Sequence, residues 1–119
     1  MPNRIGVHRH VAAVQQAFRC YYCKAPIWER DPSNFVAEHR ISRKQAALVR
    51  STAEHLRPRS EGGPNSRANI VAACLYCNTT RHKARKPLAP EAYRARVQRR
   101  VALGRWLTFM VFSARQRRL

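Results

Sequence analysis

The four cysteines of this 119-residue chain form two pairs with the same spacing, Cys20-x-x-Cys23 and Cys74-x-x-Cys77. Two thiolates separated by two residues can bind one ion from a single turn, and two such turns supply the four ligands of a tetrahedral zinc site. Disulfides are the main alternative, but nothing in the sequence indicates an oxidising compartment. A thioredoxin-like redox pair would need a βαβ context that is missing here. We therefore expect a structural Zn²⁺ site that joins two distant segments.

A second group of ligand-type side chains lies between and just after the cysteine pairs. Glu54 adjoins His55, and in a strand such neighbours point to opposite faces, so that one can hold a metal while the other acts on a reacting atom. Asn78 and His82 are four residues apart and share one face of a helix. We expect Glu54, Asn78 and His82 to converge on one divalent cation. Carboxylate and amide oxygens suit Mg²⁺ or Mn²⁺, and the imidazole widens the choice to Ni²⁺, Co²⁺ or Zn²⁺.

The charge of the chain predicts a polyanionic partner. There are 24 Lys and Arg residues against 6 Asp and Glu, and the formal net charge is +18. So much like charge repels itself unless a polyanion shares the surface, and Arg, which forms two-pronged phosphate contacts, is far more frequent than Lys. We expect a nucleic acid, with double-stranded DNA favoured. The basic residues nearest the ligand group are candidates for phosphate contacts: Arg57, Arg59, Arg81, Lys83, Arg85 and Lys86.

Several short motifs follow one another in the middle of the chain: residues 54–58 read EHLRP, Gly62-Gly63 follows, then Asn69-Ile-Val, then Cys74-x-x-Cys77-Asn78, and finally His82-Lys. Over about residues 20–83 this combination resembles the zinc-bearing branch of the HNH endonucleases. The resemblance implies a β-hairpin followed by a helix that together hold one catalytic metal. The expected fold is therefore α+β, a small ββα-metal core held together by a four-cysteine zinc site, with flanking helices.

The resemblance also implies roles for individual residues. His55 would be the general base that activates water, and Asn69 would orient His55 and its loop. Glu54 stands where the family usually has Asp as a metal ligand, and its extra methylene moves the carboxylate further from the strand. Asn78 would be the second ligand, and His82 matches a position that supplies a further ligand in some members. The implied reaction is metal-assisted phosphodiester hydrolysis that leaves 5′-phosphate and 3′-hydroxyl ends.

Hydrophobic spacing and turn residues predict the elements that must position these groups. We expect helices over residues 11–19, 38–50, 78–85, 91–103 and 105–115. Residues 52–56 are predicted to form a short strand, residues 69–74 form a short apolar segment, and residues 60–66 form the clearest loop. The apolar cluster between Trp106 and Phe112 is interpreted as core or as a contact between subunits, which would allow a homodimer through the C-terminal helices.

The chain is short enough for one domain with terminal extensions. We divide it into an N-terminal helical arm (1–19), a nuclease core with the zinc site (20–86) and basic C-terminal helices (87–119). No apolar run is long enough to cross a bilayer, and the N-terminus lacks the apolar core of a signal peptide, so we expect a cytoplasmic protein. Two alternatives to a nuclease remain: a non-catalytic zinc module that binds nucleic acid, and a structural protein of a nucleoprotein assembly.

Overall fold

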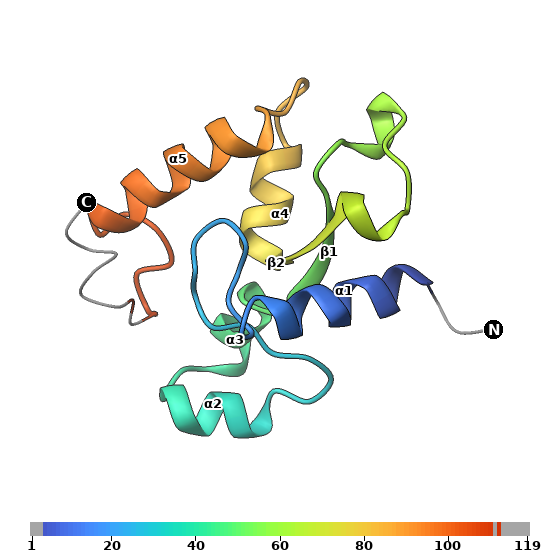
Figure 1. The fold of residues 1–119 in the computed structure, drawn as a ribbon. Coiled ribbons are helices and arrows are strands. Elements are labelled where there is room, and N and C mark those ends of the chain that lie inside the picture. Colours follow the sequence, from blue (N-terminus) through green and yellow to red (C-terminus); the bar gives the residue numbers. More distant parts are fainter. Residues whose placement is uncertain (1–3, 111, 113–119) are drawn as a thin grey trace.

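The computed structural model describes residues 4–110 and 112. Within them the chain forms short helices around a two-stranded sheet (Figure 1). In chain order the elements are α1 (Arg4–Gln15), α2 (Ser33–His39), α3 (Arg43–Leu48), β1 (Ser51–His55), β2 (Ile70–Cys74), α4 (Leu75–His82) and α5 (Pro90–Ala102). Two 3₁₀ turns, Arg59–Glu61 and Arg67–Asn69, lie in the long connection between the strands.

The centre of the fold is the hairpin of β1 and β2 with α4 packed against it. The strands are antiparallel, and Ser51 lies opposite Cys74 while His55 lies opposite Ile70. Cys74 is both the last residue of β2 and the N-cap of α4, where its sulfur accepts a hydrogen bond from the Cys77 amide. The strand therefore passes into the helix without a loop. This β-β-α order confirms the predicted α+β class and its ββα core.

Helix α1 covers the hairpin and protects its open edge. The helix packs against both strands, and two small residues, Ala12 and Ala13, are buried on its inner side. A sheet edge leaves backbone groups unpaired. The Gln16 side chain forms hydrogen bonds with both backbone groups of Ala72 at this edge: its Nε2 donates to the carbonyl, and its Oε1 accepts from the amide. The predicted helix over residues 11–19 thus exists but begins earlier and ends earlier.

The single helix predicted over residues 38–50 is wrong. The structure has two helices there, and Arg40 ends the first of them with a left-handed backbone (φ 53°). Ser42 then begins α3 with a capping box, because its side chain accepts from the Gln45 amide while the Gln45 side chain accepts from the Ser42 amide. A cap of this kind stabilises the start of a new helix. The prediction missed it because the residues of the whole segment favour helix, so that no break is visible in the sequence.

The C-terminal part of the chain packs into the same core as the hairpin. Helix α5 begins at Pro90, where the missing N–H costs nothing, and it buries Tyr93, Val97 and Val101. The helix predicted over residues 105–115 is wrong over residues 105–110, which form turns; residues 111 and 113–115 lie outside the described part. These turns place apolar side chains in the core, which confirms the core interpretation: Trp106, Leu107, Met110 and Phe112.

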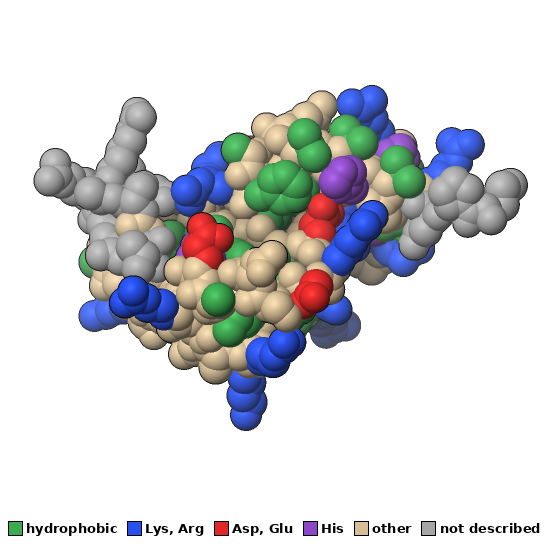
Figure 2. Space-filling view, turned by 90° about the horizontal axis from the view of Figure 1, so that it is seen from below, with side chains coloured by type: hydrophobic (Ala, Val, Ile, Leu, Met, Phe, Trp, Pro, Cys, Tyr) green, Lys and Arg blue, Asp and Glu red, His purple; other side chains and the backbone are tan. Residues whose placement is uncertain are grey.

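The division into residues 1–19, 20–86 and 87–119 stays a prediction, although helices from all three parts contribute to one core. On the outside, Lys and Arg side chains are spread over the face shown in Figure 2, with acidic side chains set singly among them. Of the helices formed by the described residues, none combines the length and apolar character needed to cross a membrane.

Candidate metal centres and catalytic cleft

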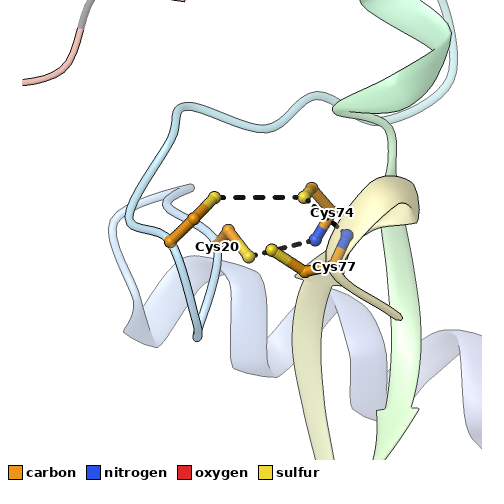
Figure 3. Close-up of side chains that lie close together, drawn as sticks. Cys20, Cys74 and Cys77 are labelled. Carbon is orange, nitrogen blue, oxygen red and sulfur yellow. Dashed lines mark hydrogen bonds between the residues drawn. The ribbon is translucent and has the colours of Figure 1, made fainter. Parts of the chain in front are cut away.

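The four cysteines meet at one point inside the molecule. All four are fully buried and free of disulfides, and their Sγ atoms lie within 4.8 Å of one another. Figure 3 shows the sulfurs of Cys20, Cys74 and Cys77 drawn together from a loop near the N-terminus and from the junction of β2 with α4. The structure therefore brings the two predicted pairs into a single cluster.

The cysteine cluster fits a zinc ion in its spacing and in its chemistry. Four sulfurs held at about 2.3 Å from a tetrahedral Zn²⁺ lie about 3.8 Å apart, and the distance between the sulfurs of Cys23 and Cys74 is 3.9 Å. Backbone amides donate to three of the sulfurs: Ala25 N to Cys23, Cys74 N to Cys20, and Cys77 N to Cys74. Such donors favour the thiolate form that a metal requires.

Burial and mutual contact shift the thiol pKa values in different directions. Burial raises the pKa of Cys23 and Cys77 well above the ordinary value. Burial also acts to raise the pKa of Cys20, but hydrogen bonds with the other three cysteines outweigh it and hold the pKa well below the ordinary value. The opposite directions for Cys20 and for Cys23 and Cys77 follow from the close contact of the sulfurs inside the molecule.

The second predicted group also comes together. Glu54, His55, Asn78 and His82 line one open cleft of about 480 Å³, with Arg59 and Ser60 on its rim side. Glu54 and His55 come from the end of β1, whereas Asn78 and His82 lie one turn apart on α4. The ββα packing thus places the two halves of the predicted metal site against each other.

The nearest contact in the cleft joins two predicted metal ligands. Oε1 of Glu54 lies 2.8 Å from Nε2 of His82. The two atoms form a hydrogen bond, which His82 donates if the carboxylate is ionised. A small hard cation bound by both atoms would take the place of that proton, because two neighbouring ligand atoms of an octahedral ion lie about 3 Å apart. The Glu54 side chain is almost fully buried, and the His82 side chain is about one-third exposed.

Asn78 offers its amide oxygen to the same cleft. Its Nδ2 donates to Oγ1 of Thr52 and to the carbonyl of Ala53 on β1. Because a carbonyl only accepts, these contacts fix the amide group with its nitrogen towards the strand. The remaining atom, Oδ1, is the one that suits a hard cation. The residues present therefore fit the divalent cation that the sequence predicts.

The inner oxygen of the Glu54 carboxylate has partners that the sequence did not suggest. Oε2 accepts from the Tyr22 hydroxyl at 2.7 Å and from Nη1 of Arg81 at 2.9 Å. Burial and the adjacent Glu54 charge raise the pKa of Tyr22 well above its usual range, so its hydroxyl keeps the proton it donates. Both partners are buried.

Arg81 needs a correction, because it is not a surface contact for phosphate. Its side chain is only 1% exposed, and its donors are directed inwards to Glu54 and to the carbonyls of His55, Leu56 and Leu88. A guanidinium whose N–H groups are used in this way has none left for a phosphate. The remaining candidates for phosphate contacts are all exposed: Arg57, Arg59, Lys83, Arg85 and Lys86.

The His55 side chain forms its hydrogen bond with the loop between β1 and β2. Its Nε2 lies 2.8 Å from Oδ1 of Asn65, which can only accept, so Nε2 carries the proton and Nδ1 has the free lone pair. Asn65 was missed at the sequence level, where it was one polar residue of a loop. The only sign of its role in the sequence was its position two residues after Gly62-Gly63, because that glycine pair indicates a tight turn near the site.

Asn69 holds the loop that carries Asn65. Its Oδ1 accepts from the Arg57 amide, and its Nδ2 donates to the carbonyls of Arg57 and Pro64. It therefore joins the two ends of the turn that follows His55. Gly63 is required at the same place, because a Cβ there would lie 1.8 Å from the Arg57 carbonyl oxygen.

The comparisons with known proteins agree with this geometry. A family model described as HNH endonuclease matches residues 20–84, more than half of the chain. Searches against curated proteins and against solved structures returned no significant match. The matched segment runs from the first cysteine to just beyond α4, and so contains both candidate metal centres.

Proposed function

Because this chain belongs to the HNH endonuclease family, we propose that it is a metal-dependent endonuclease that hydrolyses DNA phosphodiester bonds. The observation that carries the proposal is the cleft at the end of β1, where Glu54, Asn78 and His82 face one another beside His55. The ion pair with Arg81 accounts for the burial of Glu54, but it does not account for the three ligand-type side chains that line one cleft beside His55.

In the proposed reaction His55 is the general base. Nδ1 takes a proton from a water molecule, which attacks the phosphorus in line with the leaving oxygen. The hydrogen bond between Nε2 and Asn65 keeps the imidazole in the tautomer that this step needs. Asn69 acts on His55 only through the loop, since its hydrogen bonds join Arg57 to Pro64.

Glu54, Asn78 and His82 are the residues that would hold the catalytic cation. The bond between phosphorus and the 3′ oxygen breaks as the water oxygen bonds to phosphorus, and the departing 3′ oxygen takes a proton from solvent. The cation would neutralise the charge that develops on the phosphate and on that oxygen. The products then carry 5′-phosphate and 3′-hydroxyl ends. Oxygen ligands favour Mg²⁺ or Mn²⁺, and the imidazole of His82 leaves room for Ni²⁺, Co²⁺ or Zn²⁺.

The basic surface would bring the substrate to the cleft. Arg59 lines the cleft itself, whereas Lys83, Arg85 and Lys86 are exposed just after the end of α4. Such contacts fix the register of a duplex without reading its sequence. One cleft per chain produces a nick, and a double-strand break then requires a second chain or a second event.

A supercoiled-plasmid assay tests the proposal. Zinc-loaded wild type and His55→Ala are incubated with Mg²⁺, Mn²⁺, Ni²⁺ or EDTA. We expect metal-dependent nicking by the wild type and its loss in His55→Ala, while both shift the plasmid equally in EDTA. Equal cutting by the two proteins would show that His55 is not the base. A shift without cutting in every metal would instead establish a non-catalytic module that binds nucleic acid.

A further inference from the structure

We propose that Tyr22, a residue of the first cysteine pair, is a positioning residue that holds Glu54 so that Oε1 alone faces the catalytic cation. This inference rests on the proposed nuclease function. It links the structural zinc site to the metal affinity of the cleft. Tyr22 lies 32 positions before Glu54 in the chain, and neither its residue type nor its place between two cysteines indicates such a role.

The contact between Tyr22 and Glu54 is well isolated from solvent. Tyr22 has no exposed surface, and Glu54 is 1% exposed. The hydroxyl lies 2.7 Å from Oε2, a distance typical of a hydrogen bond to an ionised acceptor. A carboxylate without partners at this depth would be strongly disfavoured, and the two donors on Oε2, Tyr22 and Arg81, compensate for its burial.

The two donors also divide the carboxylate into an inner and an outer oxygen. Oε2 points into the protein towards Tyr22 and Arg81, whereas Oε1 points to His82. A carboxylate free to rotate could turn either oxygen outwards, and fixing one of them removes that freedom before the cation arrives.

Tyr22 is itself fixed by the cysteine cluster and by α5. Its flanking residues, Tyr21 and Cys23, belong to the turn that brings Cys20 and Cys23 together. The Tyr22 ring meets the Tyr93 ring edge to face at 4.8 Å. The Tyr93 hydroxyl donates to the carbonyl of Cys77, and the Gln98 side chain donates to the carbonyl of Tyr22. Zinc bound by the four cysteines would therefore hold the backbone from which the Tyr22 hydroxyl reaches Glu54.

The test is the affinity of zinc-loaded, DNA-free protein for Mn²⁺, measured by titration calorimetry. Tyr22→Phe removes only the hydroxyl and keeps the ring in its packing. Partners of metal ligands typically change metal affinity 10- to 100-fold, and we expect Mn²⁺ to bind about tenfold more weakly. Tyr21→Phe is the matched control, because it removes a hydroxyl from the same turn that is not bonded to Glu54; its Mn²⁺ affinity should equal that of the wild type.

Two further readouts separate positioning from folding. Zinc content should be the same in Tyr22→Phe and Tyr21→Phe. Tyr22→Phe should melt somewhat lower, because the buried Oε2 of Glu54 loses one of its two donors, but it should remain fully folded at the assay temperature. The nicking rate of Tyr22→Phe should recover as Mn²⁺ approaches saturation, whereas His55→Ala should not recover at any concentration. Loss of zinc, or a nicking defect that saturating Mn²⁺ leaves in place, would assign Tyr22 to the fold and overturn the inference.

The outcomes also separate this inference from the proposed function. Wild-type affinity for Mn²⁺ in Tyr22→Phe would refute the role of Tyr22 and leave the nuclease proposal intact. Binding of Mn²⁺ by the wild type without nicking would refute the nuclease proposal, while the comparison of the two tyrosine variants would still hold. A wild type that neither binds Mn²⁺ nor nicks would refute both.

Discussion

Arg81 shows how the surroundings of one residue decide its role. In the sequence it is one of twelve basic residues after Asn78, next to a candidate metal ligand, and a phosphate contact was the natural expectation. In the structure it is buried and pairs with Glu54 at 2.9 Å. The charge of a buried guanidinium is tolerable only because a buried carboxylate and several carbonyls surround it. Its contribution is therefore to stability and to the shape of the cleft.

Replacing Arg81 should accordingly destabilise the protein. Arg81→Gln leaves the Glu54 charge with one donor fewer in a dry environment, and breaking a buried ion pair typically costs about 3 to 5 kcal/mol. We expect a loss of about 3 kcal/mol in the free energy of unfolding of the zinc-loaded protein in urea. Arg85→Gln, an exposed control on the segment after α4, should change stability by less than about 0.5 kcal/mol. Similar losses in both variants would mean that the burial of Arg81 is unimportant.

At the same scale, the sequence identified the chemistry but not the partners. The types and spacings of the cysteines and of Glu54, Asn78 and His82 were enough to predict two metal centres. The structure gathers the four cysteines into one cluster, and the catalytic centre stays a prediction. The hydroxyl of Tyr22 and the amide of Asn65 could not be found in this way, because each acts on a residue that is brought close only by the fold. Spacing in a sequence indicates contacts within one helix or turn, and it carries little information across the 32 positions between Tyr22 and Glu54.

Among the elements, the connection between β1 and β2 is the one most sensitive to a single methyl group. Gly62 has a positive φ of 80°, and the Cβ of any residue at position 63 would meet the Arg57 carbonyl oxygen at 1.8 Å. The loop between Pro58 and Asn69 must therefore close tightly in order to place Asn65 against His55. Its two glycines are required by geometry rather than by flexibility.

Gly63→Ala should therefore open this loop and disturb His55. We expect nicking to fall at least tenfold, the equivalent of about 1.4 kcal/mol, with zinc content unchanged. Gly104→Ala is the matched control: its φ is 68°, but no atom lies within 4 Å of the added Cβ, so it should lose some stability and keep its activity. Full activity in Gly63→Ala would show that the loop does not position His55.

The junction of β2 with α4 is the element on which the zinc site depends. Cys74 ends the strand, caps the helix and faces Cys23 across the cluster. Structural zinc sites contribute to folding directly, so Cys74→Ser should release zinc and lower the melting temperature of the whole domain. Zinc can be measured by elemental analysis and unfolding by circular dichroism. An unchanged zinc stoichiometry and melting temperature would refute the zinc assignment.

The elements were predictable where local pattern and tertiary packing agree. Residues 52–56 form the expected strand within a residue, and the apolar segment 69–74 forms the second strand of the hairpin that the family resemblance implied. The prediction failed at Arg40–Ser42, where the capping box starts a new helix, and at residues 105–110. In residues 105–110 the apolar side chains reach the core from turns, and Leu107 has a positive φ of 45°. Such a backbone conformation results from packing against the rest of the core and not from the local sequence.

For the molecule as a whole, the C-terminal third has two functions at once. Helix α5 buries Tyr93, Val97 and Val101, while Arg96, Arg99 and Arg100 are exposed on its outer side. Removal of this region would expose the core, so a deletion cannot measure its contribution to binding. Substitution of the exposed charges separates the two functions, because it leaves the buried side unchanged.

We expect Arg96→Gln, Arg99→Gln and Arg100→Gln combined to weaken DNA binding and to flatten its salt dependence. Each lost phosphate contact reduces the slope of log K against log salt by about 0.9, so the slope should fall by between about 1 and 3. A control with the same charge change is Arg40→Gln, Arg43→Gln and Lys44→Gln, at the α2–α3 end far from α5 (Figure 1). Equal slopes for both variants would mean that α5 does not face DNA.

The position of the cysteines along the chain has a consequence for synthesis on the ribosome. Cys23 is made long before Cys77, and at about 5 to 20 residues per second the interval is on the order of 3 to 10 s. During that time the emerging segment has half of a zinc site, and His82 and α5, which complete the cleft and its support, follow later still. A nascent or interrupted chain that stops before residue 74 therefore has no zinc-ordered hairpin and no complete cleft. On the proposed function, cutting therefore requires synthesis to continue beyond His82, and a chain interrupted earlier is expected to be inactive.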